Sequence, residues 1–139
     1  MIRKKQHENI TDRLLLKYIY EQYYPTFCSF DKTNQNRSTK MYVPIDCESI
    51  AKKFNLDPHL VFGRLYFHLD KKYGYTNNDG TIVPLFALKI ADDRHVVNFP
   101  LLSAIVAELD QSFSRFSLTL LLSSVAILIS IISIFLQYF

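Results

Sequence analysis

The C-terminal part of the chain carries its longest apolar run. From Phe116 to Leu136 the sequence contains 21 consecutive residues without a charge, a proline or a glycine. A helix of this length spans about 31 Å, which matches the hydrocarbon core of a bilayer. The pattern therefore predicts one transmembrane helix over residues 116–137, preceded by a juxtamembrane helix over residues 100–115.

The residues on either side of this run predict its orientation. Arg115 lies just before the run, and only residues 137–139 follow it. A basic residue favours the cytoplasmic side of a membrane, and aromatic residues suit the interface. The basic segment 1–7 is not followed by the apolar run of a signal peptide. We therefore expect a single-pass protein of the cell membrane whose N-terminal domain, residues 1–99, lies in the cytoplasm.

Small and hydroxyl-bearing residues recur in the apolar run at alternating spacings of four and three. This heptad spacing places residues on one face of a helix that pairs with another helix. Small side chains let membrane helices approach closely, although each hydroxyl can also bond its own backbone. We expect association with a second copy or with another membrane protein, along a seam that continues backwards through Ile105 to Leu102. Within the membrane the seam consists of Thr119, Ser123, Ala126, Ser130, Ser133 and Gln137.

The soluble part opens with helical spacing. Apolar residues recur at three- and four-residue intervals over residues 9–23. Asn9 or Thr11 can cap this helix, and Pro25 is expected to end it. A polar loop over residues 31–40 has no candidate core residue, so we expect it to be the most mobile loop of the domain.

A short strand and two helices are predicted after this loop. The strand covers residues 41–45, and Asp46 caps the helix that follows. Asn55 suits the left-handed position that ends a helix. An Asp-Pro pair at residues 57–58 starts the next helix, which runs to about Lys72. Its inward side chains are Val61, Leu65 and Leu69.

Turn-forming residues predict a β-hairpin after the second of these helices. Strands over residues 73–76 and 81–90 flank the segment Asn77–Gly80, which contains an Asp-Gly turn. A further turn over residues 91–94 leads to a short strand over residues 95–98.

A helix-turn-helix pattern spans Ser49 to Tyr75, which reads SIAKKFNLDPHLVFGRLYFHLDKKYGY. It resembles the core of MarR-like winged-helix proteins, with Ile50-Ala51 at the inward pair of the first helix and residues 54–58 at the turn. The resemblance implies an α+β fold, in which a winged helix-turn-helix domain precedes a long helix that continues into a single transmembrane helix. It also implies that the second helix of the motif enters the major groove of DNA and that the hairpin, or wing, contacts the backbone.

The outward face of that second helix is poorly suited to reading bases. It has no Asn, Gln, Ser or Thr between residues 58 and 72, and its exposed apolar residues favour a protein partner. The expected wing tip over residues 77–80 has no Lys or Arg for phosphate. We therefore interpret the partner-binding face as Leu60, Arg64, Phe67 and Lys71. DNA binding is the less favoured alternative, with phosphate contacts from His59, Lys72, Lys32, Arg37 and Lys40.

Charge and reactive side chains narrow the function further. The net charge is +3, with 13 basic and 8 acidic side chains in residues 1–72 and 3 and 5 in residues 73–139. This balance falls short of a strongly basic nucleic-acid binder. Cys28 and Cys47 lack metal-binding spacing, the four histidines are scattered, and the three glycines form no phosphate loop. We expect no enzymatic activity, no metal and no cofactor.

These patterns favour a membrane-anchored winged-helix interaction or regulatory module that is non-catalytic and self-associates through its tail. Two alternatives stay open. One is a membrane-tethered, DNA-binding transcriptional regulator, and the other is a small subunit of a larger membrane complex.

Overall fold

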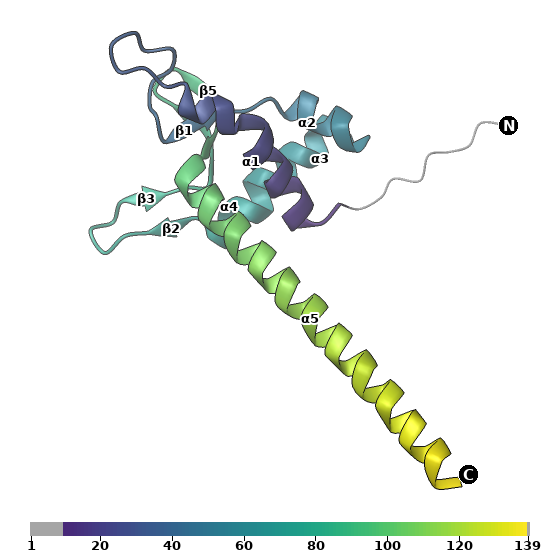
Figure 1. Cartoon of the computed structure of the whole chain (residues 1–139). Helices are drawn as coiled ribbons and strands as arrows, with labels where there is room; N and C mark the ends of the chain where they lie inside the picture. The colour runs from purple at the N-terminus through teal and green to yellow at the C-terminus, as the bar shows by residue number, and fades with distance from the viewer. Residues whose placement is uncertain (1–9, 139) are drawn as a thin grey trace, which may run out of the picture. The chain divides into compact units, whose positions relative to one another are not determined.

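The computed structural model describes residues 10–138, which combine helices with small antiparallel sheets (Figure 1). The chain divides into two compact units, the first ending at Val106 and the second beginning at Ala107. Three strands form one sheet in the order β1-β5-β4, and β2 pairs with β3. The elements are α1 (Asp12–Cys28), β1 (Tyr42–Pro44), α2 (Cys47–Phe54), α3 (Pro58–Gly63), η1 (Arg64–Leu69), α4 (Asp70–Tyr73), β2 (Tyr75–Thr76), β3 (Ile82–Val83), β4 (Phe86–Ile90), β5 (Asp93–Asn98) and α5 (Phe99–Tyr138).

Strand β5 is the centre of the three-stranded sheet. Its Val97 lies opposite Val43 of β1 and Phe86 of β4, in antiparallel register on both sides. All three side chains are buried, as expected where β-branched and aromatic residues pack across a pleated surface. Helical residues complete this core, namely Leu15, Leu16, Ile19, Ile50, Val61, Leu65, Leu69, Phe99 and Leu102.

Helix α1 begins where the sequence predicts but ends later. Thr11 caps its start, because the Thr11 hydroxyl oxygen accepts a hydrogen bond from the Leu14 N–H at 3.2 Å. Asn9, the other predicted cap, lies outside the described residues. The predicted end at Pro25 is wrong, since the helix continues to Cys28.

Aromatic packing stabilises α1 beyond Pro25. A proline inside a helix removes one backbone hydrogen bond. Here Phe27 stacks on Phe99 with ring centroids 4.7 Å apart, and Tyr20 stacks on Phe99 at 5.3 Å. The Ser29 N–H closes the last turn by donating to the Pro25 carbonyl at 3.0 Å. Contacts with a residue more than 70 positions away in the chain therefore extend the helix.

The predicted boundaries of α2 and the predicted start of α3 are confirmed. Asp46 caps α2 by accepting a hydrogen bond from the Glu48 N–H at 2.9 Å. Asn55 ends α2 in the left-handed conformation, with a φ of 55°. Asp57 caps α3 by accepting a hydrogen bond from the His59 N–H at 2.8 Å. Short polar side chains that bond nearby backbone groups define this turn.

Residues 58–73 form a continuous helix in which η1 is a π-helical turn. The Asp70 N–H donates to the Leu65 carbonyl, five residues earlier. Val61, Leu65 and Leu69 are buried as predicted. On an α-helix, steps of four residues drift by about 40° each, and a wider turn counteracts that drift. The π-helical turn thus keeps these three side chains on one buried face.

The predicted long strand over residues 81–90 is wrong. Strand β3 ends at Val83, and β4 begins at Phe86 and pairs with β5. Asp70 stabilises the break, because its Oδ1 accepts hydrogen bonds from the N–H groups of Leu85 at 2.7 Å and Phe86 at 3.1 Å. The Asp70 carboxylate therefore accepts hydrogen bonds from backbone N–H groups where the first hairpin ends and the second begins.

The first turns of α5 belong to the globular unit, which extends to Val106. Phe99, Leu102 and Ile105 are buried in its core. The seam predicted to continue backwards through Ile105 to Leu102 is therefore wrong, because these side chains are already covered by their own domain.

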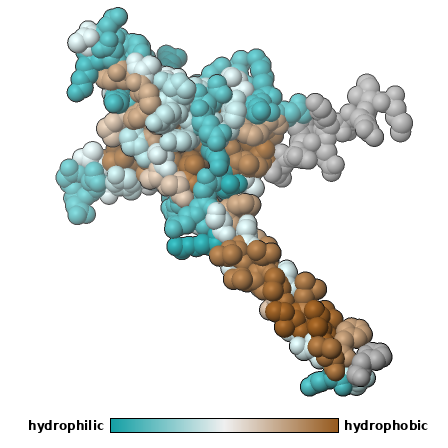
Figure 2. Space-filling model, in the orientation of Figure 1, coloured by the Kyte–Doolittle hydropathy of each residue, from teal (hydrophilic) through white to brown (hydrophobic). Residues whose placement is uncertain are grey.

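The remainder of α5 forms an apolar helix. All residues from 111 to 138 are exposed, and no charge follows Arg115. Within the described residues, α5 is the one helix long and apolar enough to cross a membrane. Figure 2 shows the hydrophobic surface that covers this part of the chain.

Candidate interaction surfaces

The outward side of the helix over residues 58–73 carries two large apolar side chains. Leu60 is 63% exposed and Phe67 is 71% exposed. Leu60 also borders a notch of about 200 Å³. We call Leu60, Phe67, the exposed Lys71 and this notch the α3 face. The notch is lined by Ile10, Leu15, Leu56, Leu60, Val61 and Arg64.

Arg64, predicted to point outward on this face, turns toward α1 instead. Its Nε donates to Asp12 Oδ1 at 2.9 Å, and its Nη2 lies 2.7 Å from the same oxygen. Its Nη1 donates to the Ile10 carbonyl at 2.5 Å. The predicted role of Arg64 as a free partner-binding group is thus corrected, because its guanidinium joins two helices.

Two further cationic side chains lie near the same carboxylate. Lys72 Nζ, a predicted phosphate contact, is 3.9 Å from Asp12 Oδ2, and His68 Nε2 is 3.6 Å from it. Both side chains are at least half exposed. Since Arg64 already neutralises Asp12, this edge of the α3 face carries excess positive charge.

Arg37 was also expected to contact phosphate from a mobile loop, and the structure corrects this. Its side chain is buried, at 8% exposure, and burial lowers the pKa of its guanidinium. Its guanidinium donates four hydrogen bonds to backbone carbonyls, so it ties the loop to α1 and is not free to bind phosphate. The acceptors are the carbonyls of Thr26, Phe27, Thr39 and Lys40.

The remaining predicted phosphate contacts lie on different elements. Lys32 and Lys40 are exposed on the loop, and Lys40 Nζ sits 5.5 Å from the ring centroid of Phe27. The His59 side chain is exposed at the start of α3, with Nδ1 3.1 Å from Asp57 Oδ1. The backbone N–H of His59 lowers the pKa of the Asp57 carboxyl group.

The β4–β5 hairpin carries a cation pair that the sequence analysis did not assign. Lys89 and Arg94 lie directly opposite each other and are exposed. Like charges in this position destabilise a sheet, which makes the pair a candidate anion contact. The turn over residues 91–94 is the signal in the sequence for this hairpin, but the Asp-Gly turn at residues 79–80 predicts a hairpin further upstream.

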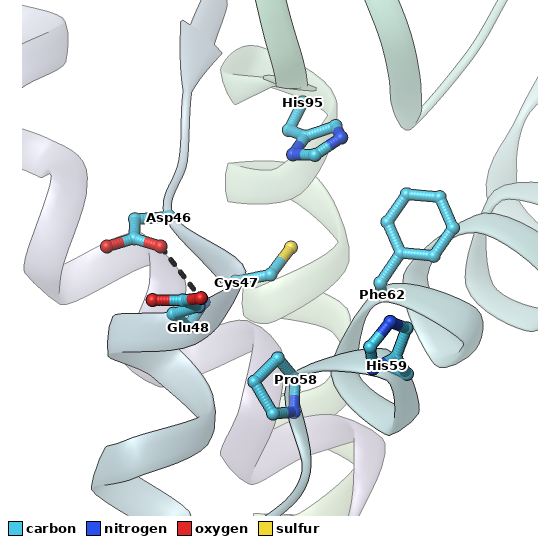
Figure 3. A pocket seen from close by; sticks show the side chains of 7 residues that line it. All are labelled: Asp46, Cys47, Glu48, Pro58, His59, Phe62 and His95. Atoms are coloured by element: carbon cyan, nitrogen blue, oxygen red, sulfur yellow. Dashed lines mark hydrogen bonds between the residues drawn. The ribbon is translucent and has the colours of Figure 1, made fainter.

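A cavity of about 460 Å³ opens between α2, α3 and β5 (Figure 3). The ring centroids of Phe62 and His95 are 5.5 Å apart at its wall. His95 adopts a φ of 49° inside β5, a conformation that costs energy for a side-chain-bearing residue. The lining residues are Asp46, Cys47, Glu48, Pro58, His59, Phe62 and His95.

The Cys47 thiol, which lines this cavity, is poorly suited to act as a nucleophile or a metal ligand. Burial, together with the negative charge of Asp46, raises the pKa of Cys47 to about 11. The thiol is therefore protonated near neutral pH, whereas nucleophiles and metal ligands are thiolates. Within residues 10–138, no group of three or more His, Cys, Asp or Glu residues is placed to hold a metal ion.

The hydroxyl groups of the predicted membrane seam bond within their own helix. The Ser123 hydroxyl donates to the Thr119 carbonyl and the Ser130 hydroxyl to the Ala126 carbonyl, both at 2.9 Å. Thr119 and Ser133 make the same bond to the carbonyl four residues earlier. These hydroxyl groups are therefore already bonded, and the seam residues favour close approach of a second helix mainly because their side chains are small.

Comparisons with known proteins identify no relative of this chain. No protein-family model, curated protein or solved structure matches it.

Proposed function

We propose that this chain is a non-catalytic interaction module, a winged helix-turn-helix domain held at the cytoplasmic face of the cell membrane by its C-terminal helix. The observation that carries the proposal is the exposure of Leu60 and Phe67. A helix that reads DNA presents polar side chains on its outward face. Large apolar side chains left in water indicate a surface that a protein partner covers.

The order of the elements supports the winged-helix assignment. The resemblance calls for a helix-turn-helix followed by a hairpin wing, and α2, α3 and the β4–β5 hairpin occur in that order. Strand β5 also pairs with β1, which precedes α2. The wing in this proposal is the β4–β5 hairpin and not the β2–β3 hairpin.

The composition of α5 supports membrane attachment. Its last charged residue is Arg115, and the uncharged segment after it is long enough to cross the hydrocarbon core. The basic residue before the segment supports a cytoplasmic domain. The small residues from Thr119 to Gln137 support pairing of the tail with a second helix.

Co-purification of the full chain tests the interaction proposal. We expect a stoichiometric partner in detergent extracts of membranes, and we expect Leu60→Ser with Phe67→Ser to remove it. Leu88→Ser is the control, because Leu88 is an exposed apolar side chain on β4 and does not belong to the α3 face. Partners that are unaffected by the double variant would contradict the proposal. A much larger heteromeric assembly that depends on the same residues would favour the small-subunit alternative.

A membrane-tethered DNA-binding regulator is the second candidate, and the Lys89–Arg94 pair favours it. Cations on a wing can contact the DNA backbone. This candidate predicts that the full chain in detergent micelles binds duplex DNA with steep salt dependence, and that Lys89→Ala with Arg94→Ala weakens binding. Absence of binding at low salt would exclude it.

A further inference from the structure

The α3 face combines exposed apolar side chains with a recess. Leu60 and Phe67 are both exposed on the helix over residues 58–73, and the π-helical turn begins between them. Leu60 borders the notch beside α1, whereas Phe67 lies on the side opposite the buried Leu65 and Leu69. The notch beside Leu60 adds a recess with mostly apolar lining into which a partner side chain can fit. Two exposed apolar side chains and a recess together define a surface that the apolar face of a partner can cover.

Positive charge borders these anchors. Lys71 and Lys72 are exposed at the Phe67 end, and His68 lies beside them. The nearby acidic groups are already engaged, since Asp12 binds Arg64 and Asp70 accepts two backbone N–H groups. The rim therefore favours a partner that brings negative charge.

The basic rim disfavours a second copy as the occupant, and the apolar side chains disfavour DNA. In a symmetric dimer through the α3 face, each copy would place its basic rim near that of its partner. Against DNA, Leu60 and Phe67 would face phosphate and polar base edges, with which they form no hydrogen bonds.

We propose that the α3 face binds an acidic amphipathic helix of a different protein, with apolar anchors held by Leu60, Phe67 and the notch and with carboxylates near Lys71 and Lys72. This inference rests on the proposed interaction function and specifies the class of partner. The partner helix carries apolar residues at i, i+3 or i+4, and i+7, with Asp or Glu beside them.

Two synthetic peptides test this chemistry. Both carry the same apolar stripe, but one has Glu and the other Lys at the flanking positions. Fluorescence anisotropy measures their binding to the full chain in nanodiscs of zwitterionic phosphatidylcholine, whose neutral surface does not recruit either peptide by charge. We expect the acidic peptide to bind at least about tenfold more tightly than the basic peptide.

Variants of the chain locate the binding site. We expect Phe67→Ser to weaken the acidic peptide about tenfold or more, and Lys71→Glu to weaken it while strengthening the basic peptide. Leu88→Ser and Lys89→Glu are matched controls, because both side chains are exposed on β4 and neither belongs to the α3 face or lines its notch. We expect both variants to leave binding unchanged. Equal affinity for the two peptides would overturn the proposal, as would binding that ignores Phe67→Ser.

A second copy of the chain or DNA on the α3 face would give different results in these measurements. Self-association in nanodiscs or micelles that Phe67→Ser abolishes, or DNA binding that competes with the acidic peptide, would overturn the assignment of a helical protein partner. If Phe67→Ser removes a co-purifying partner while the two peptides bind equally, the interaction function survives and only the acidic chemistry fails. If neither partner nor peptide depends on Phe67, both proposals fail.

Discussion

The carboxylate of Asp12 lies 2.7 Å from the guanidinium of Arg64, so the first turn of α1 is joined to the helix over residues 58–73. Arg64 also donates to the carbonyl of Ile10. On sequence grounds Arg64 belongs to the outward face of a candidate recognition helix. In the structure its role is to hold two helices together, and Leu60 and Phe67 are left as the exposed features of that face.

Arg64→Met should therefore lower the stability of the globular unit. The Asp12 and Arg64 side chains are partly exposed, so we expect a loss of about 1 kcal/mol, the upper range for a partly screened ion pair. Lys71→Met is the control, because Lys71 is exposed on the same helix and should have little effect. Chemical denaturation of the full chain in micelles, followed by near-ultraviolet circular dichroism of its tyrosines, compares the two. Equal effects would contradict a structural role for Arg64.

The close approach of Gly74 to Asp70 predicts opposite outcomes for two glycines. A Cβ added at Gly74 would lie 2.7 Å from the Asp70 carbonyl oxygen, whereas at Gly63 its nearest neighbour would be a side-chain atom of Phe67 at 3.8 Å. Gly74→Ala should destabilise the domain by about 1–3 kcal/mol through backbone displacement. Gly63→Ala should stabilise it by about 0.5–1 kcal/mol, because alanine favours a helix.

The same denaturation measurement applies to both glycine variants. A stable Gly74→Ala protein would show that the helix end can shift without disturbing the Asp70 contacts to Leu85 and Phe86. A destabilised Gly63→Ala protein would show that the helix near Phe67 has no room for a methyl group.

Local signals were sufficient for some elements and insufficient for others. Asp46, Asn55 and Asp57 act on backbone groups within a few residues, so the boundaries of α2 and the start of α3 could be predicted. Arg37 and Asp70 act across the fold, on carbonyls of α1 and on N–H groups beside β4. No short window of sequence contains those partners. The buried arginine and the divided hairpin were therefore missed.

The candidate surfaces also differ in whether local sequence signals could predict them. The outward position of Leu60 and Phe67 followed from helical periodicity and is confirmed by their exposure. The Lys89–Arg94 pair depends on how the strands after residue 73 pair into hairpins. Asp70, a side chain in the preceding helix, accepts hydrogen bonds at the break between β3 and β4, so periodicity alone could not identify the pair.

The two cysteines should differ strongly in reactivity. Cys28 is exposed and Cys47 is buried, with its pKa raised to about 11 by burial and by Asp46. At pH 8 about one Cys47 thiol in a thousand is ionised. We expect N-ethylmaleimide to label Cys28 much faster, as measured by mass spectrometry of the native chain. Comparable rates at pH 8 would contradict the burial of Cys47.

The raised pKa of Cys47 also predicts an alkaline loss of stability. The unfolded thiol ionises near its ordinary pKa of about 8.5, below the folded value. The unfolded state therefore loses its proton first, and stability that is complete below about pH 8.5 should fall as the pH rises toward 11. Cys47→Ala should remove this component of the pH dependence.

Tail association gives the last prediction, because the chain contains two matched pairs of serines. Ser123 and Ser130 lie on the predicted seam, whereas Ser117 and Ser124 have the same separation but lie off it. All four hydroxyls donate to the carbonyl four residues earlier, so replacement removes the same local bond in each pair. Ser123→Ile with Ser130→Ile should weaken association by about 1 kcal/mol, since the larger side chains hold the two helices apart.

Ser117→Ile with Ser124→Ile should leave association unchanged. Energy transfer between labelled full-length chains in bilayers measures both variants. Equal losses in the two pairs would mean that hydroxyl content, and not the position of the seam, controls association. No loss in either pair would show that the C-terminal helix does not self-associate along this face, and the tail would then serve as an anchor or bind a different membrane protein.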